Sequence, residues 1–398
     1  MTYRRIIAVG ALSALGCVPL DVFAQSAVTL YGVVDEGISY SSNAGGHKLW
    51  GTASGVLQGD RWGLRGTEDL GGGLSALFVL ENGFDISTGK LGQGGLEFGR
   101  RAFVGLQDKR FGTVTLGRQY DSIVDYPAPF ADRGLGGGYV AAHPGDVDNF
   151  NNAYRTNNAI KYQSPITGGF RFGGMYSLGG IAGDVTRDQI WSLGAGYEQG
   201  PAAFSVAYLN VRNPNVGYFG TNSSTTLTAA TANVTSPVYS GFVSAHTYQV
   251  IGAGGAYRFG AATLGATYSN IQFLNLGDTA TSGVNPSGYR GAVHFNNGEL
   301  NLGYQFTHAF SMTIAYDYMK SGGVAATTGE NTGATYQQGA LSGDYAFSKR
   351  TDVYLIGVYQ HASGTDSRNR PAVASINGLS ASSSSSQTSV TLGLRHRF

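Results

Sequence analysis

Cysteine is almost absent from this chain, and its one copy, Cys17, lies near the N-terminus. Charge is also scarce: Asp, Glu, Lys and Arg make up 13% of the 398 residues, against about a quarter in typical soluble domains. Positive charge is not in excess, because the formal net charge is +1. The lack of cysteine excludes a disulfide framework. The lack of basic excess argues against nucleic acid as a partner.

Long apolar runs are missing as well. The apolar stretch at residues 6–18 follows two arginines and leads to small residues that suit cleavage after Ala24. This pattern is typical of a secretory signal peptide, and the stretch is too short to cross a bilayer. We expect residues 1–24 to be a cleaved signal peptide. A lipoprotein processed at Cys17 is the alternative, but the usual branched residue three positions earlier is an alanine.

Glycine, with 62 residues, and tyrosine, with 24, are abundant, and apolar residues alternate with polar or small ones in segment after segment. Clear examples are residues 264–269, 299–306, 310–318 and 390–398. A period of two is typical of a strand whose two faces meet different solvents. No window of eleven or more residues after residue 24 shows an apolar stripe of helical period. The sequence therefore predicts an all-β fold.

Connections of two lengths alternate along the chain. Short turns are expected near residues 71–73, 109–112, 167–169, 199–201, 259–261, 307–308 and 348–350, and long polar loops at residues 41–56, 86–96, 120–157, 179–188, 213–246, 271–297, 320–336 and 362–387. Seven turns and eight loops join sixteen antiparallel strands. An even number of strands, with short turns on one side and long loops on the other, is typical of a bacterial outer-membrane barrel.

A soluble β-sandwich also has alternating strands, but it would place charge on its outer face. Here the charge-poor face ends in aromatic residues, as a girdle at a membrane interface requires; these include Phe84, Tyr197, Tyr257, Phe259, Tyr304, Phe306, Tyr345 and Phe347. A closed barrel also pairs every backbone amide within hydrocarbon. We expect one transmembrane barrel over residues 25–398. Residues 353–358 are apolar on both faces, which indicates either a subunit contact or a wide lumen lining.

Several segments resemble the general diffusion porins of β-proteobacteria, a family of Gram-negative outer-membrane channels. They are AVTLYGVVD at residues 27–35, RWGLRGTEDLGGGL at 61–74, RAFVGL at 101–106, FGTVTLGR at 111–118, NNAIKY at 157–162 and the ending LGLRHRF at 392–398. The resemblance implies a sixteen-stranded, water-filled barrel in the outer membrane that passes small hydrophilic solutes and ions. It also implies a homotrimer among outer-membrane lipids and lipopolysaccharide.

The same resemblance implies that the third long loop, residues 120–157, folds into the lumen and narrows it. By motif position, the family's constriction arginines correspond to Arg61, Arg101, Arg118 and Arg155. The acidic side of the constriction would come from Asp121, Asp125 and Asp132. Arginines across a water path from acids would create a transverse field, and we expect weak anion selectivity.

Strand alternation predicts the direction of each of these side chains separately. It directs Arg61, Arg65 and Arg101 into the lumen, together with Glu81 and Lys161. Strict alternation directs Arg118 outward, so an inward Arg118 requires a bulge or bend at Gly117. The final residue, Phe398, completes the aromatic girdle, and the resemblance implies that the barrel assembly machinery reads it as a signal.

Other functions remain as alternatives. A substrate-specific channel would line its path with aromatics, which here lie mostly on the outward phase, and an adhesin or purely structural barrel would not conduct. A barrel enzyme is disfavoured, because the sequence has no nucleophile motif such as Gly-x-Ser-x-Gly opening a helix. Its seven histidines show no metal-ligand spacing. We therefore expect a channel with no cofactor and no metal.

Overall fold

A computed structural model describes residues 27–220, 233–278, 283–327 and 329–398. The expected signal peptide lies outside these residues. The strands are β1 (Ala27–Ala44), β2 (His47–Ser54), β3 (Arg61–Gly71), β4 (Leu74–Gly83), β5 (Arg101–Asp108), β6 (Gly112–Gln119), β7 (Thr156–Gln163), β8 (Phe170–Ser177), β9 (Ile190–Gln199), β10 (Ala202–Arg212), β11 (Ala245–Phe259), β12 (Ala262–Leu276), β13 (Gly291–Gln305), β14 (Phe310–Ser321), β15 (Val324–Ala326), β16 (Gly329–Asn331), β17 (Ala334–Ala346), β18 (Thr351–Gly364) and β19 (Ser386–Arg397).

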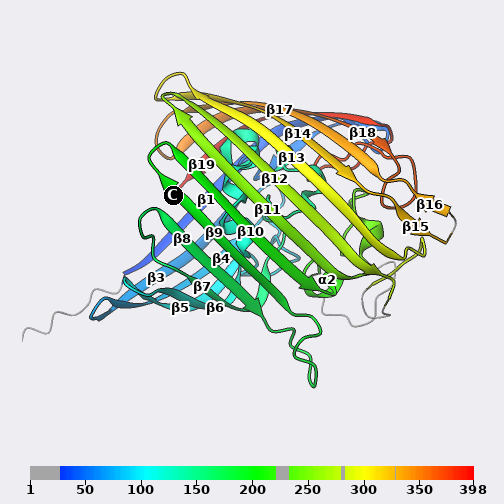
Figure 1. Cartoon of the computed structure of the whole chain (residues 1–398). Coiled ribbons are helices and arrows are strands. Elements are labelled where there is room, and N and C mark those ends of the chain that lie inside the picture. The colour runs from blue at the N-terminus through cyan, green and yellow to red at the C-terminus, as the bar shows by residue number, and fades with distance from the viewer. Residues whose placement is uncertain (1–26, 221–232, 279–282, 328) are drawn as a thin grey trace, which may run out of the picture.

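These strands form a closed antiparallel barrel whose long strands are tilted (Figure 1). Each strand pairs with its neighbours along the chain, and β19 closes the barrel on β1. Residues 36–44 of β1 pair with β2 and residues 27–33 pair with β3, so β2 and β3 are two parts of one barrel strand. The short strands β15 and β16 form a separate hairpin. The barrel therefore has sixteen strands, as predicted.

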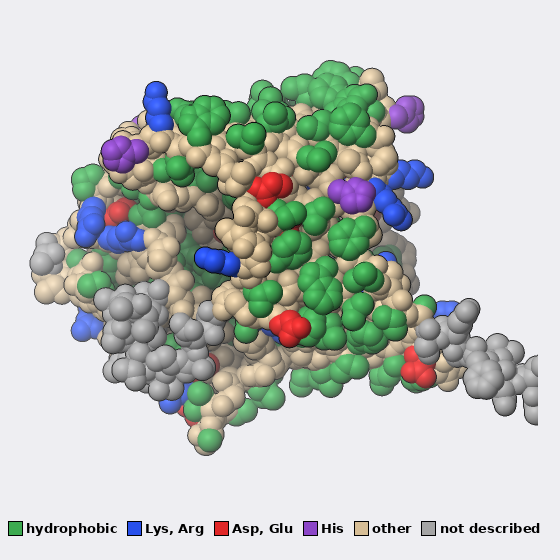
Figure 2. All heavy atoms as spheres, turned by 180° about the vertical axis from the view of Figure 1, so that it is seen from behind, with side chains coloured by type: hydrophobic (Ala, Val, Ile, Leu, Met, Phe, Trp, Pro, Cys, Tyr) green, Lys and Arg blue, Asp and Glu red, His purple; other side chains and the backbone are tan. Residues whose placement is uncertain are grey.

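The two faces of the strands explain why the sequence folds this way. On β13, Leu300 is 62% exposed on the outer surface, whereas its neighbour Asn301 is 2% exposed and points inward. Hydrophobic side chains spread over the outer face, and charged ones are few among them (Figure 2). At the short-turn end, exposed aromatic rings contact one another, such as Tyr304 and Phe306 with centroids 4.7 Å apart. This is the surface of a lipid-facing barrel with an interfacial girdle.

All seven predicted short turns join strands, but two of the predicted long loops are shorter than expected. Within residues 41–56, β1 and β2 continue to a two-residue turn at residues 45 and 46. The irregular segment at residues 55–60 instead divides β2 from β3. Within residues 271–297, β12 and β13 extend beyond the expected strand ends. At the β12–β13 end the inward residues Phe273 and Phe295 are apolar because they pack on the aromatic segment between β10 and β11, so the alternation of apolar outward and polar inward residues is lost there.

Helical turns are short. They are α1 (Ser122–Asp125), η1 (Ala128–Phe130), η2 (Arg133–Gly137), η3 (Tyr139–Ala141), η4 (Pro144–Asp146), α2 (Pro214–Gly217) and η6 (Ser240–Phe242). Within the described ranges of the chain, no helix has the length and apolar character needed to cross a membrane. Among the residues that the structure describes, five of the seven helical turns lie in the third long loop.

Part of the interior is filled by an aromatic core. Tyr218, Phe219, Tyr239 and Phe242, from the segment between β10 and β11, pack on rings from the inner faces of β11, β12 and β13. Polar composition had predicted a simple polar loop at residues 213–246. The few aromatic residues in it determine its position, because each buries a large apolar area.

The inward residues of the segment 353–358 have an explanation other than an open lumen lining. Tyr354, Ile356 and Val358 of β18 are buried against the third loop, including Val140 and Ala141. Their apolar character therefore provides a hydrophobic surface on which the loop packs. The outward residue Leu355 is 52% exposed in the single chain.

Candidate functional site

The third loop lies against the inner wall of the barrel, where its turquoise helical turns are seen between the strands (Figure 1). Inward side chains hold its backbone: Asn301 Nδ2 donates to Phe130 O at 2.9 Å, and Gln338 Nε2 donates to Ala142 O at 3.0 Å. Asn301 is on β13 and Gln338 on β17. Because these contacts come from the inner face, the loop occupies part of the lumen.

A cavity of about 710 Å³ lies between this loop and the opposite wall. Its charged lining residues are Arg61, Arg100, Arg133, Arg395, Arg397, Asp125 and Asp344. A second cavity of about 340 Å³ shares Arg61, Arg100 and Arg133 with the first and adds Arg155. Positive charge is therefore concentrated where the two cavities meet, and an anion crossing this region meets more guanidinium groups than carboxylates.

One buried carboxylate organises part of this arginine group. Glu81 on β4 accepts from Arg100 Nε at 2.9 Å, from Arg101 Nη2 at 2.7 Å and from the Tyr31 hydroxyl at 2.9 Å. The guanidinium of Arg101 also lies over the ring of Tyr120, 5.6 Å from its centroid. Two arginines share one carboxylate, so the group formed by Arg100, Arg101 and Glu81 retains a net positive charge.

Other arginines have no carboxylate partner. Arg61 Nε donates to Gly59 O at 3.0 Å, and Arg133 Nε donates to Phe150 O at 3.1 Å. In the described part of the chain, neither lies within 4 Å of a carboxylate oxygen. Arg395 and Arg397 differ, since both bind Asp352 at 3.0 Å. Arg61 and Arg133 are thus uncompensated charges on opposite sides of the path.

The remaining predicted basic residues have distinct places. Arg65 lies over the ring of Tyr31 at 5.3 Å from its centroid. The guanidinium of Arg155 lies over Tyr120, 5.6 Å from the ring centroid, and burial, together with the nearby Arg100 and Arg118, lowers its pKa to about 10. Lys161 forms an ion pair with Asp125 and donates to Tyr120 O at 2.9 Å. Lys161 therefore fixes the start of the loop.

Strict alternation directs Arg118 outward, and an inward Arg118 requires a bulge or bend at Gly117. The structure has a bulge at this position. Gly117 has φ of +135°, and the pairing of β6 with β7 shifts between Gly117 and Gln119. The pairing with β5 is regular, however, and keeps Arg118 on the outward phase of Leu116. Its Nε donates to Gly99 O at 2.8 Å. In the described part of the chain, Arg118 therefore makes no hydrogen bond or ion pair with Glu81, Arg100 or Arg101.

Two of the three predicted acids do not face the water path, which corrects the expected acidic side. Asp121 is fully buried, where it caps α1 through Ile123 N and accepts from Tyr218 and Asn149. Burial raises its pKa. Asp132 is 1% exposed and lies behind the loop beside Glu299. Asp125 does line the larger cavity, but Lys161 neutralises it. The transverse field expected from loop acids is therefore weaker than the positive field of the arginines.

Four arginines that line the cavity were not among the predicted constriction residues: Arg100, Arg133, Arg395 and Arg397. Arg395 and Arg397 had a signal, because both lie on the polar phase of the last strand opposite Leu394. Arg100 precedes β5 and Arg133 belongs to the loop, so alternation could not place either of them.

Comparisons with known proteins agree with this geometry. The Gram-negative porin family model matches residues 11–365. An outer membrane porin protein of Bordetella pertussis is 29% identical over 413 residues, covering 94% of this chain and 95% of the relative. Outer membrane porin protein 32 of Delftia acidovorans is 29% identical over 418 residues, covering 99% of each chain.

Solved structures show the same fold. An anion-selective porin from Comamonas acidovorans has a TM-score of 0.70 at 22% identity, with 94% of this chain and 100% of that chain covered. The outer-membrane protein OmpT of Vibrio cholerae has a TM-score of 0.62 at 16% identity, with 94% and 98% covered. The chain belongs to the Gram-negative porin family: it is a channel-forming β-barrel of the bacterial outer membrane rather than an enzyme.

Proposed function

We propose that this porin is a general diffusion channel with a preference for small anions. The observation that carries the proposal is the charged lining of the larger cavity, five arginines against two aspartates, with Asp125 paired to Lys161. Fixed charges around a narrow path select permeating ions by Coulomb energy. The Comamonas acidovorans structure of the same fold is named anion-selective.

We also propose that the protein works as a homotrimer embedded among outer-membrane lipids and lipopolysaccharide. The apolar outer surface is exposed in a single chain, with Trp50 70% and Val28 63% exposed, and lipid and partner subunits would share it. One solved structure of the Vibrio cholerae protein is described as a trimer form.

One recording tests both proposals. In a planar bilayer with a KCl gradient, we expect the reversal potential to have the sign of chloride permeation, because the arginines lower the energy of anions in the path. Voltage-induced closure should proceed in three equal steps, one for each subunit. A reversal potential of the opposite sign would refute anion preference. Closure in a single step would refute the trimer, and solute-specific block of the current would favour a specific channel instead.

The last residue supports a proposal about assembly. Phe398 exchanges two backbone hydrogen bonds with Gly32, of 3.0 and 3.1 Å, and so joins the last strand to the first. Its ring covers Gly32, where a Cβ atom would lie 2.3 Å from the ring. The ring is 46% exposed, so part of it is available to the barrel assembly machinery.

Deleting Phe398 should lower the yield of assembled porin severalfold in the outer membrane. The refolded barrel should lose only about 1–3 kcal/mol, because two net hydrogen bonds are lost and each contributes roughly 0.5–1.5 kcal/mol. Heat-modifiability on gels measures the yield, and urea unfolding measures the stability. Phe398→Tyr, which keeps an aromatic end, serves as the control. Equal losses in both measurements would mean that Phe398 acts only in the folded barrel.

A further inference from the structure

Behind the third loop lies a buried cluster of acids with one histidine. His143, Asp132, Asp146 and Asp148 come from the loop, whereas Glu299 and Asp317 come from the inner faces of β13 and β14. All six are at most 3% exposed. Among the described residues, no lysine or arginine forms an ion pair with any of these carboxylates. Burying so many carboxylates is costly unless protons or a bound cation neutralise them.

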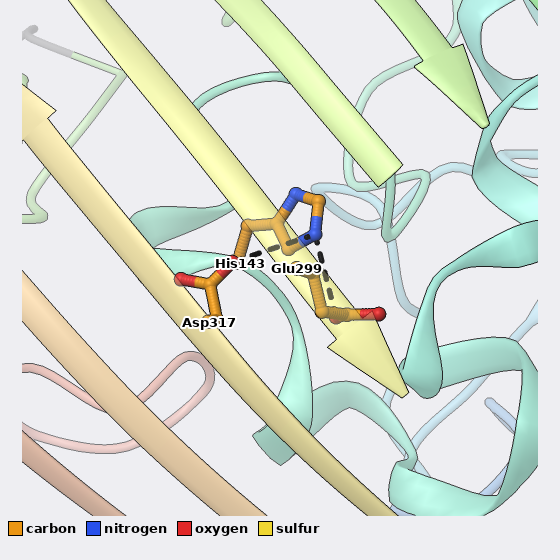
Figure 3. Close-up of side chains that lie close together, drawn as sticks. All are labelled: His143, Glu299 and Asp317. Atoms are coloured by element: carbon orange, nitrogen blue, oxygen red, sulfur yellow. Dashed lines mark ion pairs between the residues drawn. The ribbon is translucent and has the colours of Figure 1, made fainter. Parts of the chain in front are cut away.

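The orientation of His143 is fixed from one side. Its Nδ1 lies 2.6 Å from Asp148 Oδ2, and this carboxylate also accepts from Ser269 Oγ at 2.6 Å. A proton on Nδ1 leaves the Nε2 lone pair directed toward the wall. Glu299 Oε2 lies 3.4 Å from Nε2, and Asp317 Oδ2 lies 3.7 Å from it (Figure 3). A histidine held by a carboxylate through one nitrogen, with the other nitrogen facing further carboxylates, is a common arrangement of a metal ligand.

The distances themselves favour an ion between the three groups. Hydrogen bonds from N–H to oxygen are about 2.7–3.2 Å long, and both ion-pair contacts of Nε2 are longer than this. Two ligands at about 2.1 Å from a tetrahedral zinc ion lie about 3.4 Å apart. The donor atoms of His143, Glu299 and Asp317 all lie within 4.8 Å of one another. The hydroxyl of Thr267, at 3.4 Å, is the other polar neighbour of Nε2.

A second observation also points to a ligand. Asp132 Oδ1 and Asp317 Oδ1 are buried and have no hydrogen-bond partner. Asp132 adjoins the cluster, because its backbone N–H donates to Glu299 Oε1 at 2.8 Å. Each of these two carboxylates therefore retains a buried acceptor oxygen that no donor of the described residues satisfies.

We propose that His143 Nε2, Glu299 and Asp317 bind one divalent transition-metal ion, Zn²⁺ by preference, which ties the third loop to the barrel wall. One imidazole and two carboxylates are ligands that zinc accepts in a tetrahedral site. A proton on His143 is the competing cation. The donors belong to one loop and two strands, so the ion would enter as the loop docks during folding.

Zinc content measured after refolding tests the site. The mature chain is refolded in detergent with ZnCl₂ or with a chelator, separated by gel filtration and analysed for metal by mass spectrometry. We expect about one zinc per chain after refolding with ZnCl₂. Refolding with Co²⁺ should give the visible absorption bands of a tetrahedral site. Calcium and magnesium should not replace zinc at equal concentration.

Isosteric variants separate binding from folding. Glu299→Gln and Asp317→Asn keep side-chain shape and should weaken zinc binding at least tenfold and remove the cobalt bands. His294→Ala removes an exposed histidine from the same strand and should leave both readouts unchanged. Heat-modifiability verifies that each variant is folded. The proposal is overturned if the folded unmodified protein retains no zinc, if Glu299→Gln retains as much, or if calcium displaces zinc.

Discussion

Replacing Arg61 and Arg133 by glutamate should change the porin from anion-preferring to cation-preferring. These two arginines have no carboxylate partner in the described residues and lie in the lining shared by the two cavities. A unit charge about 8 Å from an ion in water contributes about 0.5 kcal/mol. The two substitutions change the local charge by four units, which raises the energy of an anion by about 2 kcal/mol and lowers that of a cation by about 2 kcal/mol. The energy difference between the two ions therefore changes by about 4 kcal/mol before salt screening. Since about 1.4 kcal/mol corresponds to a tenfold ratio, we expect the chloride-to-potassium permeability ratio to fall at least tenfold.

Reversal potentials in a KCl gradient measure this ratio, and the change should shrink at high salt. Replacing the same two arginines by glutamine should give an intermediate ratio. Arg110→Glu is the matched control, because Arg110 lies in an exposed turn outside the cavities. If the double glutamate variant kept the ratio of the unmodified porin, these arginines would not control permeation.

Glu81→Gln should destabilise the barrel and increase its anion preference. The carboxylate accepts from Arg100, Arg101 and Tyr31, and its side chain is 1% exposed. Removing one partner of a buried ion pair costs about 3–5 kcal/mol. Arg100 is nearly buried but Arg101 is 31% exposed and can be hydrated, so we expect the lower end of that range, about 3 kcal/mol.

Urea unfolding of the refolded barrel measures the stability, and reversal potentials measure the selectivity. Adding Arg100→Gln to Glu81→Gln should recover part of the lost stability, because it removes a charge that the first substitution left unpaired. Glu198→Gln, at an exposed position near a turn, controls for the loss of a carboxylate. A Glu81→Gln barrel as stable as the original would show that water, rather than Glu81, satisfies the two arginines.

The number of strands and the lipid-facing surface could be predicted from the sequence, because both depend on local pattern. Alternation on β13 and β14, with Leu300 outward and Asn301 inward, follows from the period of a strand in contact with lipid and water. The short turns likewise depend on a few adjacent residues. The predicted loop at residues 41–56 was wrong for a related reason: this part of the chain is rich in serine, glycine and other small or polar residues, and by composition it matches a loop.

Whether a charged residue of the pore could be placed from the sequence also depended on local pattern. Inward positions on strands, such as Arg61, Arg101 and Glu81, could be assigned by alternation. Residues on the third loop could not, because its path depends on what it packs against. Asp121 and Asp132 appeared equivalent to Asp125 in the sequence, yet the fold buries the first two and leaves Asp125 at the cavity.

The sequence by itself determined a sixteen-stranded outer-membrane barrel, because alternating solvents impose a period of two on every strand. Only the tertiary structure decided which charges meet. Arg61 and Arg133 face one path although they are far apart in the chain, and His143 reaches Glu299 and Asp317 only because the loop docks on β13 and β14. Docking depends on the summed packing of Val140, Ala141 and Tyr354 in three dimensions, and this has no period that a sequence can display.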